Sequence, residues 1–198
     1  MTENKLKTTF LGVELENPIF TGSGCFAFGL EYIDYFDPNK LGAIVLKGLT
    51  MEIRPGNSGS RIAETPAGML NSVGLENPGI DVFEKVTLPE IKKHINVPLV
   101  ANINGKILEE YVELTERLDK LDEIKILELN ISCPNVKDGG MAFGANPEMA
   151  RIVTREVRKV TKKPLIVKLS PNVTDIVQIA KITEEEGADG LSLINTLL

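Results

Sequence analysis

The sequence predicts an α/β fold of the (β/α)8 TIM-barrel type, incomplete in this chain and preceded by a short N-terminal β-hairpin. Apolar, β-rich segments alternate with helix-like segments, which is typical of parallel strands covered by helices. A polar residue also stands at or near the end of each of six apolar segments. A barrel brings these strand ends to one mouth, whereas a doubly wound open sheet spreads them along an edge. We therefore favour the barrel.

The hairpin is expected within residues 7–15, KTTFLGVEL. Six strands follow, each rich in apolar residues and bounded by glycine, proline or polar residues. They are expected at residues 17–24, 42–48, 97–103, 125–131, 163–169 and 188–195. The polar residues at their ends are Ser23, Lys47, Asn102, Asn130, Lys168 and Asn195. The segment GSGCFAFG after the first strand lacks the glycine spacing of a dinucleotide-binding turn, which also disfavours the open sheet.

Three helices are expected between the later strands, at residues 107–124, 146–163 and 174–190. Asn146 is a suitable N-cap for the second helix, and Pro147 suits its first turn. We expect Thr174 to cap the third helix. An earlier helix is expected to end at His94, the only histidine, where a histidine is more often a helix-terminal residue than a catalyst.

Six strands are two fewer than a closed barrel contains, and such barrels typically have about 250 residues. We therefore expect residues 1–198 to be a single barrel domain that is truncated after the sixth strand. A barrel open at this point exposes unpaired strand edges. The 198 residues alone are expected to be poorly stable.

The composition excludes several function classes. The net charge of −6 gives no support for a nucleic-acid or anionic-membrane partner. No apolar run approaches the ~20 residues of a membrane span, and the N-terminus lacks the apolar core of a secretory signal. We expect a cytoplasmic protein. With two cysteines and one histidine, a metal site made from side chains of this chain is not expected.

Cys133, in the stretch LNISCPNV, has two possible roles. Free cysteines are commonly small buried apolar residues. However, Cys133 lies just past a strand end, before Pro134 and a glycine-rich segment. A thiol there can act as a proton acceptor if its surroundings favour the thiolate over the ordinary pKa of about 8.5. Position alone leaves both roles open.

Lysines and asparagines at the strand ends are the other candidates. A lysine that ends an apolar strand, as Lys47 and Lys168 do, costs free energy unless it meets an anion or an acceptor. Salt bridges at the rim or a bound electron-rich ligand would both meet that need. Asparagine amides suit the edge of a pyrimidine or flavin ring because they donate and accept hydrogen bonds. Those in loops or at strand ends are Asn71, Asn102, Asn130, Asn135 and Asn195.

Six motifs, in order, resemble the class 1 dihydroorotate dehydrogenases, flavin-dependent enzymes of pyrimidine biosynthesis. They are VLKGLT, RIAETPAGMLNSVGLENPG, VANING, LELNISCPNV, LIVKLSPNVTDI and LSLINT, and the resemblance runs from about residue 7 to the last residue. The NSVGLENPG form and the cysteine of ISCPNV most resemble class 1B. In that class, the catalytic subunit pairs with a subunit that carries FAD and a 2Fe–2S cluster. The membrane-bound class uses serine as its base, so Cys133 disfavours it.

The resemblance implies FMN-dependent oxidation of dihydroorotate to orotate in de novo UMP synthesis, with electrons passed to NAD through the partner subunit. It implies a homodimer of catalytic subunits within a heterotetramer, and Cys133 as the base. The implied substrate-binding residues are Lys47, Asn71, Ser72, Val73, Gly74, Leu75, Asn130, Asn195 and Thr196, with Asn135 as a further candidate. The implied FMN-binding residues are Ser23, Lys47, Gly48, Asn102, Asn130, Lys168 and Ile194.

Three alternatives stay open. The first is a class 1A enzyme, a homodimer that reduces fumarate without a partner. The second is a related barrel flavoenzyme such as the dihydropyrimidine dehydrogenase domain, and the third is a non-catalytic truncated barrel. The family's glycine-rich loops for the FMN phosphate follow strands seven and eight and have no match before Leu198. We therefore expect the chain as given to bind FMN weakly or not at all.

Overall fold

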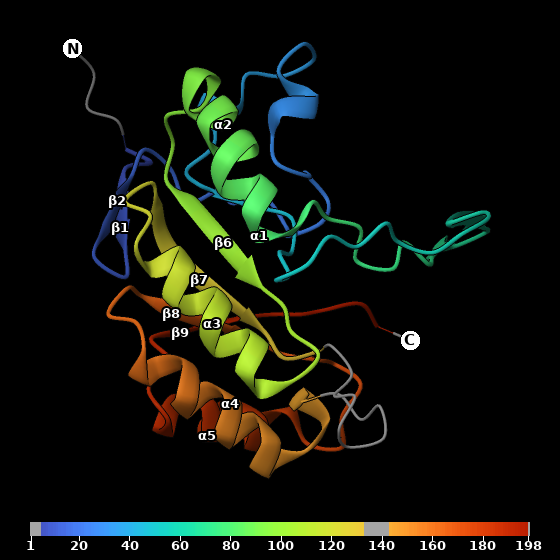
Figure 1. Cartoon of the computed structure of the whole chain (residues 1–198), viewed down its shortest axis with the longest axis vertical. Coiled ribbons are helices and arrows are strands. Elements are labelled where there is room, and N and C mark those ends of the chain that lie inside the picture. Colours follow the sequence, from blue (N-terminus) through green and yellow to red (C-terminus); the bar gives the residue numbers. More distant parts are fainter. Residues whose placement is uncertain (1–4, 133–142, 198) are drawn as a thin grey trace.

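The computed structural model describes residues 5–132 and 143–197, and its centre is a curled parallel sheet of five strands in the order β3–β6–β7–β8–β9 (Figure 1). The remaining described strands form two separate antiparallel hairpins, β1–β2 and β4–β5. The bounds are β1 Thr8–Phe10, β2 Val13–Leu15, β3 Ile44–Val45, β4 Ile62–Thr65, β5 Gly68–Asn71, β6 Leu99–Ile103, β7 Ile124–Asn130, β8 Leu165–Lys168 and β9 Gly190–Ser192. This half-barrel confirms the predicted incomplete barrel, and β1–β2 confirms the predicted hairpin.

The first predicted strand, residues 17–24, is wrong as a regular strand. In this stretch the backbone makes one parallel bridge, between Phe20 and Ala43. The hydroxyl of Thr21 accepts from the backbone N–H of Val45 at 2.9 Å and donates to its carbonyl at 3.3 Å. Side chains therefore replace part of the backbone ladder, and the chain still lies beside β3.

Helices connect the later strands and cover the convex face of the sheet (Figure 1). Their bounds are α1 Gly79–Val82, α2 Leu88–His94, α3 Leu108–Asp119, α4 Pro147–Lys159 and α5 Ile176–Glu185, with a π-helical turn at Phe83–Thr87 joining α1 to α2. Short 3-10 turns lie at Leu30–Tyr32, Pro38–Lys40 and Phe143–Ala145. The three predicted later helices and the helix that ends at His94 are confirmed.

The helix caps were predicted correctly in one case and wrongly in another. Asn146 caps α4, since its side chain accepts from the N–H groups of Glu148 and Met149. For α5 the N-cap is Asp175 and not Thr174, with the Asp175 carboxylate accepting from Val177 and Gln178. An aspartate is at least as good an N-cap as threonine, and its charge also suits the positive end of the helix.

Two apolar cores lie on opposite faces of the sheet. The larger core joins outward-facing strand residues, such as Leu127 and Val167, to the buried sides of the helices. The smaller core lies on the concave face, where Val45, Val100, Ile126 and Ile166 pack against Leu15 and the β1–β2 hairpin. The hairpin therefore closes the amino-terminal end of the concave face and leaves the carboxyl end as the open mouth.

Candidate functional site

Polar side chains follow the apolar residues along the concave face. Side chains of a strand alternate between faces, so Asn102 and Glu128 lie on the same face as the buried residues two positions earlier, Val100 and Ile126. Asn102 pairs with Glu128 in register, and Asn130 pairs with Lys168 on the next strand. The carboxyl ends of β6, β7 and β8 therefore bring amides, a carboxylate and an ammonium group to one mouth, as the barrel prediction required.

Four asparagines and one glutamate at this mouth are joined in series by hydrogen bonds, and we name this chain the amide relay. Asn195 donates to Asn130 at 3.0 Å, and Asn130 donates to Asn104 at 2.7 Å. Asn104 then donates to Asn102 at 2.7 Å, and Asn102 donates to the carboxylate of Glu128 at 2.5 Å. The inner members Asn102, Asn104 and Glu128 are buried, whereas Asn130 and Asn195 are half-buried. The relay thus runs from an accessible end to a buried carboxylate.

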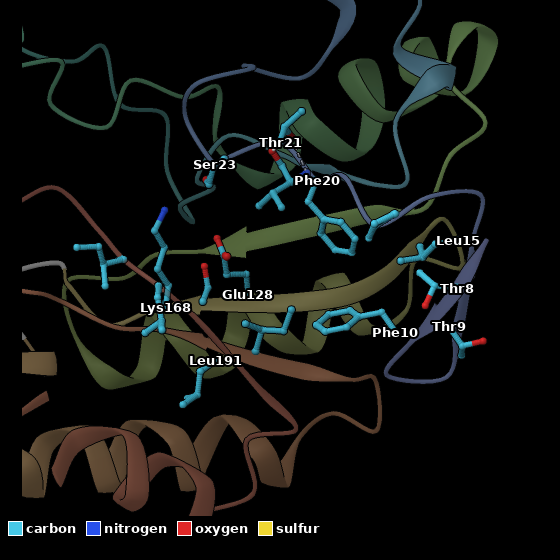
Figure 2. Close-up of a pocket in the computed structure, with 17 residues that line it drawn as sticks. Thr8, Thr9, Phe10, Leu15, Phe20, Thr21, Ser23, Glu128, Lys168 and Leu191 are labelled. Carbon is cyan, nitrogen blue, oxygen red and sulfur yellow. Dashed lines mark hydrogen bonds between the residues drawn. The ribbon is translucent and has the colours of Figure 1, made fainter. Parts of the chain in front are cut away.

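A cavity of about 450 Å³ lies against the buried end of the relay (Figure 2). At the mouth it is lined by Ser23, Glu128, Lys168, Ser192 and Ile194. Figure 2 shows the side chains of Glu128 and Lys168 extending from neighbouring strands into this space. The hydroxyl of Ser23 donates to the carbonyl of Leu46 at 2.8 Å, which ties the 22–24 turn to the rim of the cavity.

The two strand-end lysines do not form salt bridges within the described ranges 5–132 and 143–197. A rim salt bridge with a described residue therefore does not explain why a lysine stands at the end of β8. Lys47 lines a second cavity of about 420 Å³, together with Phe28, Arg54 and Glu76. The structure therefore places Lys47 and Lys168 in separate cavities.

Gly48 is the point where the backbone approaches the relay most closely. A Cβ at this position would lie 2.4 Å from Nδ2 of Asn104 and 2.9 Å from Oδ1 of Asn102 and from Cδ1 of Leu75. All three distances are shorter than van der Waals contact, so only glycine fits without a shift. The same contact brings Leu75 of the predicted substrate loop against the relay.

The remaining members of that loop lie farther out. Asn71 ends β5 and pairs with Ile62 across the exposed β4–β5 hairpin. The hydroxyl of Ser72 and the carbonyl of Val73 are held by Asn57, whose side chain and backbone N–H donate to them. Gly74 has a positive φ and also packs on Asn57. Leu75, in contrast, packs beside Gly48 at the edge of the relay.

At the carboxyl-terminal end of the described chain, Thr196 joins the relay. Its backbone N–H donates to Oδ1 of Asn195 at 2.8 Å, and its carbonyl accepts from Asn172 at 2.9 Å. On the other side, the backbone N–H of Ser132 donates to Oδ1 of Asn130 at 3.1 Å. The predicted base Cys133 and the further candidate Asn135 lie outside the described residues.

Sequence reasoning missed two members of the relay, Glu128 and Asn104. The sequence did contain a signal for Glu128, because it is a charged residue within the apolar strand ILELN. It stands two positions before Asn130, so both side chains lie on the same face of the strand. Asn104 follows Asn102 by two residues, and this spacing places both side chains on the same side of an extended chain. Asn77, in the turn ENPG, is buried and accepts from Thr50 and Gly79 at 3.0–3.2 Å.

Other candidate chemistry finds little support in the described part of the chain. His94 Nε2 lies 3.3 Å from Glu90, one turn earlier on the exposed side of α2, far in sequence from the relay. No group of three histidine, cysteine, aspartate or glutamate residues among the described positions is arranged to hold a metal ion. None of the helices there is both long and apolar enough to cross a bilayer.

Comparisons with known proteins agree with this geometry. The family model described as "Dihydroorotate dehydrogenase" matches residues 5–197. Curated relatives from Brachyspira hyodysenteriae and Alkaliphilus metalliredigens are 55% and 54% identical over 98% and 100% of the chain. A relative from Enterococcus faecalis is 51% identical over the whole chain. All three are named "Dihydroorotate dehydrogenase B (NAD(+)), catalytic subunit".

The chain spans about 64% of the length of these relatives. A solved structure of DHODH from Eimeria tenella, in complex with ferulenol, superposes with a TM-score of 0.78 at 20% identity. The match covers 98% of this chain and 60% of that one. At this identity the likeness supports the fold alone, and it agrees with the half-barrel of five strands.

Proposed function

Since the chain belongs to the dihydroorotate dehydrogenase family, we propose that the protein oxidises dihydroorotate to orotate in de novo pyrimidine biosynthesis with FMN as cofactor. The observation that carries the proposal is the amide relay, which ends beside a cavity that also contains Lys168. Amide N–H groups and one ammonium group suit ring carbonyls and carboxylates. Both FMN and orotate are rich in such acceptors.

The described residues fit a bound flavin. Ser23, Lys168 and Ile194 line one cavity, and Gly48 packs against Asn102 at the edge of the relay. We propose that these residues, with Lys47 and Asn130, hold FMN. When bound, FMN would accept the hydride that leaves C6 of dihydroorotate.

Lys168 has the most specific proposed task among them. Its ammonium group has no ion-pair partner in the described ranges, and it lies across β7–β8 from Asn130. A fixed cation stabilises negative charge that grows nearby during a reaction, and it does so more strongly where water is excluded. We propose that Lys168 stabilises negative charge beside the N1–C2 edge of the flavin.

Substrate binding is proposed for the accessible side of the same mouth. Asn130, Asn195 and Thr196 form its amide wall, and Leu75 contacts the base of that wall at Gly48. Lys47 and the loop residues Asn71, Ser72, Val73 and Gly74 would complete the binding of the ring and the carboxylate. Asn71 and Ser72 are exposed and lie on a protruding hairpin. They would need to approach the mouth to touch the substrate.

Cys133 is proposed as the base that removes the proton from C5. It follows Ser132, whose backbone N–H is held by Asn130. The chain is thus anchored to the relay immediately before the cysteine. A thiolate in this position would take the proton on the substrate side of the mouth.

The names of the relatives favour a class 1B enzyme over the fumarate-reducing class 1A, because they specify NAD(+) and a catalytic subunit. We propose that electrons reach NAD through a partner subunit with FAD and a 2Fe–2S cluster, in a cytoplasmic heterotetramer built on a homodimer of catalytic subunits. Neither a nucleic acid nor a membrane is proposed as a partner.

The full-length protein containing this chain, purified with and without its partner subunit, tests the proposal. Orotate formation from dihydroorotate should proceed with NAD only when the partner is present, and fumarate should not replace NAD. Rapid turnover with fumarate by the catalytic subunit alone would instead identify class 1A. Absence of orotate under every condition would refute the proposed function.

A further inference from the structure

The amide relay has a single direction, and the contacts at its two ends agree with that direction. At the accessible end, the backbone N–H groups of Ser132 and Thr196 can only donate, so the atoms they meet on Asn130 and Asn195 must be oxygens. At the buried end, the nitrogen of Asn102 donates to a carboxylate oxygen of Glu128. Every amide between these ends has its nitrogen toward Glu128.

This direction decides what Asn130 offers to a ligand. Its Oδ1 already accepts from Asn195 and from the N–H of Ser132, which uses both lone pairs of the oxygen. Its Nδ2 donates one hydrogen to Asn104, and no second acceptor for it lies among residues 5–132 and 143–197. Asn130 is half-buried, so a ligand at the mouth meets a donor and no free acceptor.

We propose that Glu128 is a positioning residue that holds the buried half of the relay in the direction set by Ser132 and Thr196 at the accessible end, so that Asn130 presents an N–H donor to a carbonyl oxygen of orotate. This inference rests on the proposed function. Glu128 acts through Asn102 and Asn104, and the hydrogen bonds between them are 2.5–2.7 Å long. Its carboxylate is the acceptor that ends the series.

Without an acceptor at position 128, the inner amides lose their fixed orientation. Asn102 is buried, and its nitrogen would face a position that cannot accept. Rotation of Asn102 by half a turn would place its nitrogen toward Nδ2 of Asn104 and would force the next amide to rotate as well. The orientation of Asn130 would then depend on Ser132 and Asn195 alone.

The test uses the full-length, FMN-loaded protein and the equilibrium dissociation constant for orotate, followed by the change in flavin absorbance. Glu128→Leu removes the acceptor and should weaken orotate binding roughly 10-fold or more, the range expected when a buried hydrogen bond to a charged group is lost. Glu128→Gln keeps an acceptor oxygen and should remain within roughly 3-fold of the unaltered protein. Equal losses in the two variants would overturn the proposal.

A matched control separates positioning from a general loss of stability. Thr183→Val removes the hydroxyl that donates to the carbonyl of Ala180 at 2.9 Å, a part-buried hydrogen bond on α5, which covers the opposite face of the sheet from the mouth. Both Thr183→Val and Glu128→Leu should lower the melting temperature. Only Glu128→Leu should weaken orotate binding, and a similar weakening in Thr183→Val would overturn the proposal.

A second pair of variants tests the relay if Glu128→Leu fails to load FMN. Asn102→Asp combined with Glu128→Leu moves the acceptor carboxylate one step along the relay, against Nδ2 of Asn104, and should keep orotate affinity within roughly 3-fold, whereas Asn102→Leu combined with Glu128→Leu should weaken it roughly 10-fold. An equal loss in both would overturn the inference. If the unaltered protein does not bind orotate at all, the proposed function fails instead, so the two failures are distinct.

Discussion

Gly48→Ala tests the packing of the site, because Gly48 is the closest backbone neighbour of the relay. The new methyl group would lie 2.4 Å from Nδ2 of Asn104 and 2.9 Å from Leu75. Asn104 has little room to retreat, since it is held by Asn102 and Asn130 at 2.7 Å each. Overpacking of this kind typically costs about 1–3 kcal/mol, and a strained hydrogen bond adds about 1 kcal/mol. We expect the free energy of unfolding to fall by about 2–4 kcal/mol.

Urea denaturation of the full-length protein, followed by far-UV circular dichroism, measures this change. Gly68→Ala is the matched control, because a Cβ at Gly68 meets only the hydroxyl of Thr65 at 3.8 Å. The control should change the free energy of unfolding by less than about 0.5 kcal/mol, as is usual for an exposed position. A similarly small change in Gly48→Ala would refute the close packing of Gly48 against the relay.

Three further predictions concern the base, the cation and the ion pairs. Cys133→Ala should keep FMN bound but slow flavin reduction by dihydroorotate about 10²–10⁴-fold in stopped flow, and unchanged kinetics would remove Cys133 from the mechanism. Lys168→Ala should weaken FMN binding in fluorescence titration or lower the flavin midpoint potential, because a cation is lost beside the reduced ring; if both values stay unchanged, Lys168 is not a flavin contact. The pKa of Asp81 lies below its ordinary value because Arg117 donates a hydrogen bond to it at 2.7 Å, so the stability from this pair is present above about pH 4 and is lost as the pH falls further. Arg117→Met should therefore reduce the loss of stability between about pH 4 and pH 2 in urea titrations, and an unchanged slope would contradict the assignment.

The buried strands were predicted well from the sequence, because short apolar segments that alternate with helices fit few structures other than buried parallel strands. β6 and β8 fall within the predicted segments 97–103 and 163–169, and β7 begins one residue before the predicted segment 125–131. The first segment, 17–24, was predicted as a strand for the same reason, but Thr21 and Ser23 bond to Val45 and Leu46 through side-chain hydroxyls. Propensity does not distinguish a hydroxyl that replaces a ladder hydrogen bond from one that faces solvent.

The members of the site were partly predictable, and their connections were not. Strand-end position identified Asn102, Asn130, Lys168 and Asn195, and the structure joins the three asparagines through one relay. The hydrogen bonds, however, link residues 26 and 65 positions apart, so they depend on the register of the sheet. Glu128 was missed because a charged residue within an apolar strand is usually interpreted as a strand boundary or an exposed edge.

For the hairpin β4–β5, the sequence indicates order but not which side chains are buried. Apolar residues such as Met69 and Leu70 in the segment 64–79 indicate order, and residues 62–71 do form a regular hairpin. Both side chains are nevertheless more than 60% exposed, so they contribute little to the described core. Composition indicated an ordered segment but not where its apolar side chains would lie.

Single-turnover reduction of the bound flavin tests the central claim, that the carboxyl-end mouth of this half-barrel oxidises dihydroorotate. The full-length, FMN-loaded protein would be mixed with an equal concentration of dihydroorotate under anaerobic conditions, while flavin absorbance and orotate are both measured. We expect the absorbance of the oxidised flavin to be lost, with one orotate formed for each flavin reduced. An FMN-loaded protein whose flavin stays oxidised in the presence of dihydroorotate would contradict it.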